Sequence, residues 1–312
     1  MPDPTLAPLA PLAPLNLGAV VIGRNEGKRL HTCLTSIMAL NCPVVFVDSG
    51  SSDGSAALAR SMGCIVVELD QERGFTAARA RNAGFERLAS LYPALALVQF
   101  VDGDCELNPD WLYAAVPVLW QNPWIAAVCG RRRERNPHMS PYNRLCDLEW
   151  NTPLGETHSC GGDVLMRAEA FAAVGGFQPS LIAGEEPELC FRLRRAGWTI
   201  HRIAADMTLH DAAMTRFGQW WKRNRRSGHA IAEAFADPLR DDPGLRRTFI
   251  SNVVWALPLA WPLWPLLWWR VLRRHNAEMA SLMVLAKLPH LQGQIGYWLK
   301  SRSKKSKIIE YK

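Results

Sequence analysis

The amino-acid sequence predicts an α/β fold in which helices cover both faces of a mixed, mainly parallel sheet. Short apolar runs rich in β-branched residues alternate with segments of helical spacing through the first hundred residues. These runs lack a polar alternate face, as is typical of strands buried on both sides. With 312 residues, 48% hydrophobic and 21% charged, the chain can form one large globular domain with an additional region.

Four strands are predicted in the first third of the chain, and a helix follows each of the first three. The strands are "LGAVVIG" (17–23), "VVFV" (44–47), "CIVVEL" (64–69) and "LALVQFV" (95–101). The helices are residues 30–40, 55–63 and 75–90. In such a sheet the carboxyl ends of the strands form the edge at which ligands bind.

The pattern becomes mixed in the second third of the chain. The predicted elements are a helix (111–121), a strand (124–135), a strand-to-helix turn (160–177) and a helix within 184–198. Gly161 and Gly162 in the turn permit a close approach of the backbone to a neighbour.

The C-terminal region is predicted to be hydrophobic and helical. Residues 249–269 contain no charged side chain, and this stretch is long enough to cross a bilayer as a helix. Three prolines and five tryptophans in this stretch are equally compatible with a kinked or re-entrant interfacial segment, or with a buried helix pair. A second apolar stretch, residues 279–299, precedes a basic tail with six Lys or Arg against one Glu.

These shifts in composition predict four parts of the chain. They are a disordered Pro/Ala/Leu leader (1–16), an α/β domain (17–235), a Trp-rich membrane-associated region (236–299) and a basic tail (300–312). The leader lacks the features of a signal peptide, and none of the eight cysteines forms a CxxC pair, so reduced thiols are expected. The tail and tryptophans favour the cytoplasmic face of the inner (plasma) membrane.

Carboxylates follow two of the predicted strands. Asp48 ends one strand, and Asp102 and Asp104 follow another, so all are expected at the same edge of the sheet. Two acids one residue apart repel each other unless a cation lies between them. Mg²⁺ or Mn²⁺, which prefer oxygen ligands, would fit such a pair and a bound phosphate.

The order of short motifs resembles family 2 glycosyltransferases, inverting enzymes of the GT-A fold that use nucleotide-sugar donors. The motifs are "GRNEG", "VDSGSSDGS", "AARARNAG", "VDGDCEL" and "AGEEPELCFRLRRAGW", within residues 17–230. The resemblance implies a nucleoside diphosphate sugar as donor, with a UDP-sugar favoured, and a divalent metal, Mn²⁺ or Mg²⁺, as cofactor.

The resemblance also implies roles for particular residues. The donor would be bound by Arg24, Asn25, Glu26, Asp48, Arg79, Asn82, Asp102, Gly103 and Gly162. The metal would be held by Asp104, Asp102 and His210. For Arg79, Arg81 and Arg87, a solvated helix face is the alternative interpretation.

Direct displacement at a sugar carbon needs a general base that takes the proton of the acceptor hydroxyl. Glu185 or Glu186 is expected to supply it. The family's usual Glu-Asp appears here as Glu-Glu, so Glu186 takes the Asp position with one extra methylene. This departure leaves the choice of base between the two residues open, with Glu186 favoured.

The sequence thus predicts transfer of a sugar to a lipid-linked or saccharide acceptor in cell-envelope polysaccharide or glycolipid synthesis, with no nucleic-acid partner. One alternative is a nucleotidyltransferase of similar fold, but "GRNEGKR" lacks its Gly-rich phosphate loop. Another is a non-catalytic basic module that binds membranes or nucleic acid, which would leave the ordered acidic motifs unexplained.

Overall fold

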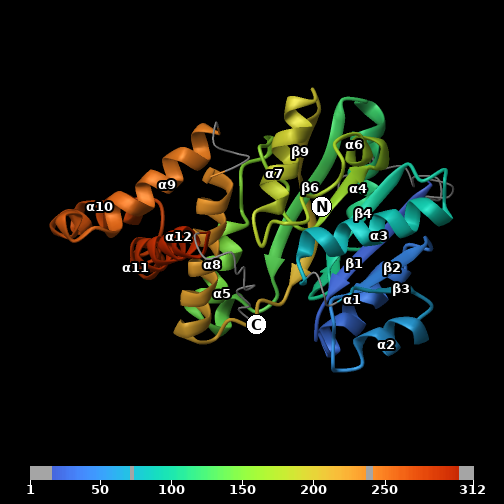
Figure 1. Cartoon of the computed structure of the whole chain (residues 1–312), viewed down its shortest axis with the longest axis horizontal. Coiled ribbons are helices and arrows are strands. Elements are labelled where there is room, and N and C mark those ends of the chain that lie inside the picture. Colours follow the sequence, from blue (N-terminus) through green and yellow to red (C-terminus); the bar gives the residue numbers. More distant parts are fainter. Residues whose placement is uncertain (1–15, 71–73, 237–241, 302–312) are drawn as a thin grey trace, which may run out of the picture.

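The computed structural model describes residues 16–70, 74–236 and 242–301. The predicted leader therefore lies outside the described residues except for Asn16, and the predicted basic tail lies outside them from residue 302 onward. The described residues form an α/β domain with a group of C-terminal helices on one side (Figure 1).

In the described part of the chain, nine strands form one mixed sheet. They are β1 (Leu17–Gly23), β2 (Val44–Asp48), β3 (Ile65–Glu68), β4 (Leu97–Asp102), β5 (Cys105–Leu107), β6 (Ile125–Glu134), β7 (Gly155–Glu156), β8 (Val164–Arg167) and β9 (Thr199–His210). The order is β3-β2-β1-β4-β8-β6-β9-β5, with β7 paired to β9. The first four strands are parallel to one another, and β8 is antiparallel to both β4 and β6. The predicted mixed, mainly parallel sheet is confirmed.

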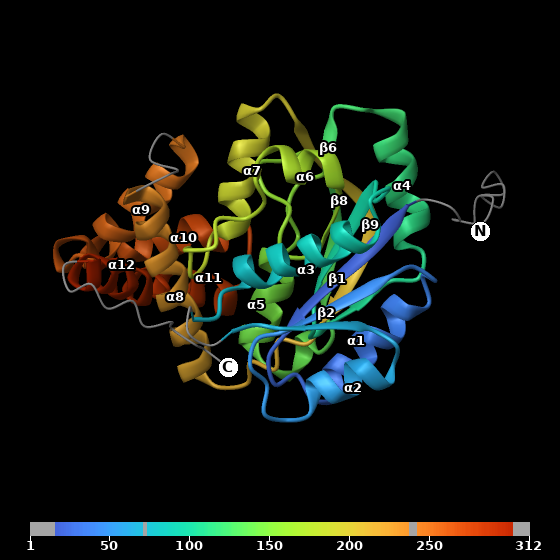
Figure 2. The same ribbon diagram turned by 45° about the vertical axis from the view of Figure 1, so that its right-hand side comes forward.

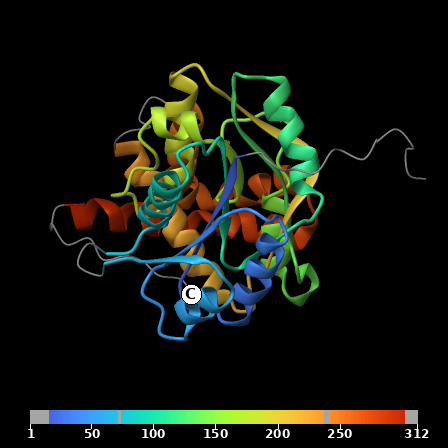
Figure 3. The ribbon, with the colours of Figure 1, turned by 90° about the vertical axis from the view of Figure 1, so that its right-hand side faces the viewer.

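Helices cover both faces of this sheet (Figure 3). The helices of the α/β domain are α1 (Lys28–Met38), α2 (Ser55–Ser61), α3 (Ala77–Leu91), α4 (Trp111–Gln121), α5 (Pro141–Glu149), α6 (Ala168–Ala173) and α7 (Glu185–Arg195). Helix α3 lies on one face, and α1 and α4 lie on the other. Gly84 lets α3 approach β1, because a Cβ there would meet Val20 Cγ1 at 2.4 Å.

Strand β9 and helix α5 are among the elements that were not expected from the sequence. The twelve-residue strand β9 pairs with β6 through register shifts, which break the alternation of buried and exposed residues that would identify a strand. Helix α5 is short, and its N-cap is Ser140, whose side chain accepts a hydrogen bond from the N–H of Asn143.

The C-terminal helices pack against α5 and against one another (Figure 2). They are α8 (Phe217–Ala236), α9 (Pro243–Ala256), α10 (Trp264–Leu272), α11 (Ala277–Leu285) and α12 (Lys287–Ser301), with a 3₁₀ helix, η2 (Pro258–Leu263), between α9 and α10. A second hydrophobic core joins them to the α/β domain; its buried members are Leu145, Cys146, Met214, Trp220, Met279 and Ala286.

Helices α8 and α12 cross with almost no space between their backbones. A Cβ at Gly228 would lie 2.0 Å from the carbonyl oxygen of His290, and a Cβ at Gly293 would lie 2.0 Å from that of Arg225. Only glycine fits at these two positions, so the crossing depends on them.

The uncharged stretch 249–269 is divided between α9, η2 and α10. Among the described residues no single helix is long and apolar enough to cross a bilayer. Pro243–Ala256 and Pro258–Leu272 meet the criterion only as a pair, which is bent by 93°. Pro258 and Pro262 lie at this bend, where a proline cannot continue a regular helix.

Candidate active site

The register of β1 with its neighbours sets two acids at one edge of the sheet. Gly23 pairs with Asp48 on β2, and Ile22 pairs with Asp102 on β4. Both strands run parallel to β1, so the two carboxylates leave the sheet at the carboxyl ends of their strands, as predicted.

Asp48 is buried and keeps one carboxylate oxygen available. Its Oδ2 accepts hydrogen bonds from the N–H groups of Gly50 (3.1 Å) and Ser51 (2.9 Å). Its Oδ1 is buried and has no hydrogen-bond partner among the described residues. A buried acceptor without a donor is costly, so this oxygen is suited to an N–H or O–H of a ligand.

The loop after β1 contacts the loop after β2. Asn25 has a left-handed backbone (φ 55°), and its Oδ1 accepts a hydrogen bond from the N–H of Ser52 at 2.8 Å. The guanidinium of Arg24 lies 5.3 Å from the centre of the Phe75 ring, and Glu26 pairs with Arg29 at 2.8 Å. The three residues predicted to border the nucleotide thus stand on the loop next to Asp48.

Asp102 is bound by two arginines. Arg81 Nη2 donates to its Oδ1 at 2.7 Å, and Arg132 Nη2 donates to its Oδ2 at 2.8 Å. Burial opposes ionisation of Asp102, but the charges of the two arginines outweigh burial and hold its pKa well below the usual range. Both oxygens of this predicted metal ligand are therefore already paired.

Arg81 also connects the sheet edge to α7. Its Nη1 donates to Glu185 Oε1 at 2.8 Å, and only 3% of its side chain is exposed. Burial disfavours the charged guanidinium, but the charges of Asp102 and Glu185 more than compensate and raise its pKa. Gly162 lies against this group, since a Cβ there would meet Arg81 Nη2 at 2.6 Å. The expected close approach at Gly162 is thus observed.

Asp104 and His210 lie together on the other side of Gly103. His210 Nε2 is 3.5 Å from Asp104 Oδ1, and His210 Nδ1 is 3.5 Å from Glu134 Oε2. Together with the Cys105 thiol, these two side chains place three ligand atoms within 4.8 Å of one another. Gly103 has no room for a side chain, because a Cβ would meet the carbonyl oxygen of Ile22 at 3.0 Å.

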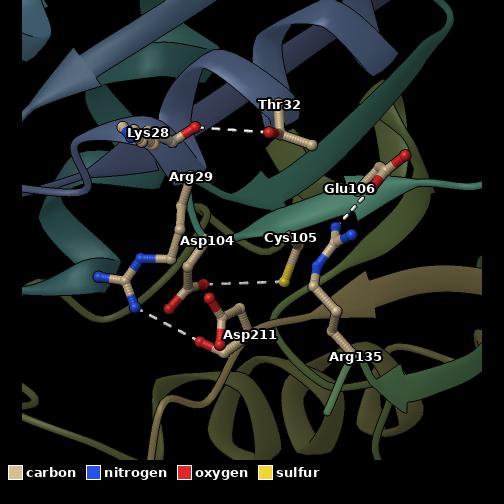
Figure 4. A pocket seen from close by; sticks show the side chains of 8 residues that line it. All are labelled: Lys28, Arg29, Thr32, Asp104, Cys105, Glu106, Arg135 and Asp211. Carbon is tan, nitrogen blue, oxygen red and sulfur yellow. Dashed lines mark hydrogen bonds and ion pairs between the residues drawn. The ribbon is translucent and has the colours of Figure 1, made fainter.

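A cavity of about 240 Å³ opens beside Asp104 (Figure 4). The residues that line it are Lys28, Arg29, Thr32, Asp104, Cys105, Glu106, Arg135 and Asp211. Figure 4 shows the carboxylates of Asp104 and Asp211 close together between the side chains of Arg29 and Arg135. The cavity thus combines basic groups with a candidate metal ligand.

Glu185 and Glu186 begin α7 but face different partners. Glu185 pairs with Arg81, whereas Glu186 Oε1 accepts hydrogen bonds from the N–H of Cys160 and from the Cys190 thiol (3.0 Å). None of the hydrogen bonds or ion pairs found in the described part of the chain uses Glu186 Oε2.

Arg79 and Asn82 make contacts that the sequence did not suggest. Arg79 Nη1 donates to the carbonyl oxygens of Asp70 and Gly74, both at 2.7 Å. Asn82 binds both the N–H and the carbonyl of Phe177. These contacts hold two loops in place, and a role for either residue in nucleotide binding stays a prediction.

Three charged residues near Asp102, two of them buried and one partly buried, were missed from the sequence. The solvated face considered for Arg81 is wrong, because the side chain is buried. Arg132 binds Asp102 and lies 3.0 Å from Asp163, whose other oxygen accepts from the N–H of Asp102. One signal in the sequence could have pointed to this group, namely an acid, Asp163, directly after Gly161-Gly162.

Comparison with families of known proteins matches residues 19–173 to glycosyl transferase family 2. The chain belongs to this family. The matched part of this family 2 glycosyltransferase includes Asp48, Asp102 and Asp104 and ends before Glu185.

Relatives of this family 2 glycosyltransferase include enzymes of glycan synthesis. Glycosyltransferase AglE of Haloferax volcanii is 25% identical over 301 residues, covering 89% of this chain and 94% of AglE. The succinoglycan biosynthesis protein ExoA of Rhizobium meliloti is 23% identical, covering 88% of this chain and 91% of ExoA.

A solved structure confirms the GT-A fold. The mannosyltransferase PcManGT of Pyrobaculum calidifontis, in complex with GDP-Man and Mn²⁺, superposes with a TM-score of 0.65 at 19% identity. The similarity covers 96% of this chain and 90% of PcManGT, so it extends through the C-terminal helices.

Proposed function

We propose that this glycosyltransferase moves a sugar, with inversion, from a nucleoside diphosphate sugar to a saccharide or lipid-linked acceptor in cell-envelope polysaccharide or glycolipid synthesis. The observation that carries the proposal is Arg81, which binds Asp102 at the donor edge of the sheet and Glu185 at the start of α7. This contact supports a single centre in which the donor-binding acids and the candidate bases are neighbours.

The nucleotide would bind at the loops after β1 and β2. Asp48 Oδ1, which is buried and has no hydrogen-bond partner among the described residues, would accept a hydrogen bond from an N–H of the base. The guanidinium of Arg24 beside Phe75 would border the same ligand. We still predict uracil as the base of the donor. PcManGT was solved with GDP-Man, so guanine is the alternative base to test.

The residues around Asp104 fit a divalent cation. A carboxylate and an imidazole nitrogen lie close together, and Glu134 stands beside the other ring nitrogen, where it would orient the ring. Mn²⁺ accepts both ligand types, so we favour it over Mg²⁺, and PcManGT was solved with Mn²⁺. Such a cation would stabilise the negative charge that develops on the leaving diphosphate. Asp102, which the arginines already hold, would act beside this site.

Glu186 is the better candidate for the general base. Glu185 is held in an ion pair by Arg81, whereas Glu186 retains Oε2 for a hydroxyl proton. The N–H of Cys160 and the Cys190 thiol fix Glu186 Oε1 and so orient the carboxylate. A positioned carboxylate of this kind is what proton removal during displacement requires.

The test is release of a nucleoside diphosphate by the purified protein. UDP- and GDP-sugars would be supplied in turn with Mn²⁺ and with lipid and saccharide acceptors. We expect one donor to be consumed, with loss of the signal on chelation and in Asp104→Asn. If every donor stayed intact in the presence of the metal and the acceptors, the proposal would be contradicted.

We further propose that the C-terminal helices attach the enzyme to the cytoplasmic face of the plasma membrane. Large apolar side chains are exposed along α9, η2 and α10; they are Ile250, Val254, Leu257, Leu259, Trp261, Leu263, Leu266 and Trp269. Beside them Arg270, Arg273 and Arg274 line a cavity of about 290 Å³. Tryptophans with adjacent arginines suit the headgroup region of an anionic bilayer.

Vesicle sedimentation tests this attachment. We expect the protein to bind vesicles that contain phosphatidylglycerol more strongly than vesicles of phosphatidylcholine alone, and to bind less in high salt. Replacing Leu259, which is 92% exposed, with Asp should weaken binding. The proposal would be contradicted if the native protein and Leu259→Asp bound equally well to vesicles with and without phosphatidylglycerol.

A further inference from the structure

Two thiols and the carboxylate of the candidate base form a compact buried cluster. Cys160 Sγ lies 3.5 Å from Cys190 Sγ, and Cys190 Sγ lies 3.0 Å from Glu186 Oε1. The three ligand atoms are within 4.8 Å of one another, and all three residues are buried. Glu186 and Cys190 are four positions apart on α7, so they share one face of the helix.

We infer that Cys160, Cys190 and Glu186 form a binding site for a thiophilic divalent cation such as zinc. Tetrahedral zinc with Zn–S bonds of about 2.3 Å separates two sulfurs by about 3.8 Å, close to the spacing observed here. Two sulfurs and one oxygen select zinc over Mg²⁺, which prefers oxygen ligands. The site is distinct from the cluster of Asp104 and His210.

Binding at this site would release protons. In the metal-free protein the hydrogen bond with Cys190 and burial raise the pKa of Cys160, and burial raises the pKa of Cys190 to about 11. Both are therefore neutral thiols near pH 7. Zinc would bind as both S–H protons leave to solvent, so affinity rises with pH. Burial and the charge of Glu186 raise the pKa of Cys129 to about 12, so a further thiol lies near the cluster.

Occupancy would stop transfer, a consequence that rests on the proposed role of Glu186. A carboxylate whose Oε1 coordinates zinc shares its negative charge with the metal, so Oε2 becomes much less basic and takes the proton of an acceptor hydroxyl poorly. Zinc would therefore inhibit the enzyme even when excess Mg²⁺ or Mn²⁺ is present.

The binding test uses the reduced full-length protein, zinc chloride and excess Mg²⁺. We expect one tightly bound zinc per chain, and Cd²⁺ in its place should produce a thiolate charge-transfer absorption. Cys160→Ser and Cys190→Ser should remove the absorption and weaken zinc binding by more than the about 10- to 100-fold that loss of an outer-sphere contact costs. Glu186→Gln should keep the absorption and bind zinc more weakly.

Two matched variants locate the site. Cys42→Ser removes a partly exposed thiol elsewhere, and Cys105→Ser removes the thiol of the cluster near Asp104. Both should retain the absorption, and circular dichroism would confirm that each variant is folded. The site would be refuted if Cys105→Ser abolished binding, if the Cys160 and Cys190 variants bound normally, or if the pair formed a disulfide with no metal bound.

The ratio of the sugar-transfer rate with zinc to the rate without zinc tests the predicted inhibition separately from binding. We expect zinc to suppress wild-type transfer and to leave the ratio near one in Cys190→Ser. Zinc that binds as described without affecting transfer would overturn the inhibitory role and the assignment of Glu186 as base. If the protein transferred no sugar at all, the binding and absorption results would still decide whether the metal site exists.

Discussion

Asp102 and Glu185 share a single guanidinium. Arg81 donates to the first at 2.7 Å and to the second at 2.8 Å, and its own side chain is almost fully buried. The end of β4 is thereby fixed relative to the start of α7.

Replacing Arg81 with Met should destabilise the fold. The change leaves Asp102 and Glu185 without their shared partner, and breaking a buried ion pair in this way costs about 3–5 kcal/mol. Urea denaturation would measure the loss. Arg87→Met, on the exposed face of the same helix, should stay within about 0.5 kcal/mol of the native protein. Equal losses of unfolding free energy in the two variants would show that the shared ion pair does not stabilise the fold.

Asp104→Asn should weaken the binding of Mn²⁺. The change removes a charged ligand oxygen that lies 3.5 Å from His210 Nε2. Loss of a direct ligand should exceed the about 10- to 100-fold effect of an outer-sphere change. Isothermal titration calorimetry with MnCl₂ would measure it, with Glu106→Gln in the wall of the same cavity as the control. A larger effect in the control would contradict the assignment.

Glu186→Gln should reduce turnover by about 10²- to 10⁴-fold, the usual contribution of a general base. Gln keeps the shape of the side chain but cannot take a proton. Initial rates at saturating donor would measure kcat, and KM for the donor should change little. Glu185→Gln is the comparison, and it should alter stability more than the pH dependence of kcat. If Glu185→Gln instead removed that pH dependence, the two roles would be exchanged.

Gly228→Ala should disrupt the crossing of α8 and α12. The added Cβ would lie 2.0 Å from the carbonyl oxygen of His290, so the helices must separate. Gly296→Ala on α12 is the matched control, because no atom lies within 4 Å of its added Cβ. The control should gain about 0.5–1 kcal/mol from helix propensity. Thermal unfolding would show shifts of opposite sign, and two positive shifts would contradict the close crossing.

Acid should destabilise the packing of α12 through His290. Burial, followed by the charges of Lys287 and Arg223, lowers the pKa of His290 to about 4, against about 6.5 in an unfolded chain. Between these values the unfolded chain binds more protons, so stability is greatest above pH 6.5 and declines toward pH 4. Urea denaturation as a function of pH would show a smaller decline in His290→Gln. The exposed His31→Gln should leave the pH profile unchanged.

The acids of the site were predictable from the sequence, whereas their partners were not. Asp48 and Asp102 end buried apolar strands, and a local pattern is sufficient to place both at one edge. Arg81 looks like any arginine of an amphipathic helix, because the groups that bury it come from β4 and α7. Strand β9 was missed for a related reason. Its irregularities arise from the register of its pairing with β6, which its own sequence does not show.

The spacing of the contacts of Arg81 along the chain has a consequence for folding. Asp102 is 21 residues away, but Glu185 is 104 residues away. During synthesis the first contact can form while α7 is still untranslated, and the second must wait for a long loop to close. The ion pair of Arg81 with Glu185 should therefore be among the last contacts to form during folding. A chain whose synthesis stopped before α7 would contain the loops of the candidate nucleotide site but not the candidate bases.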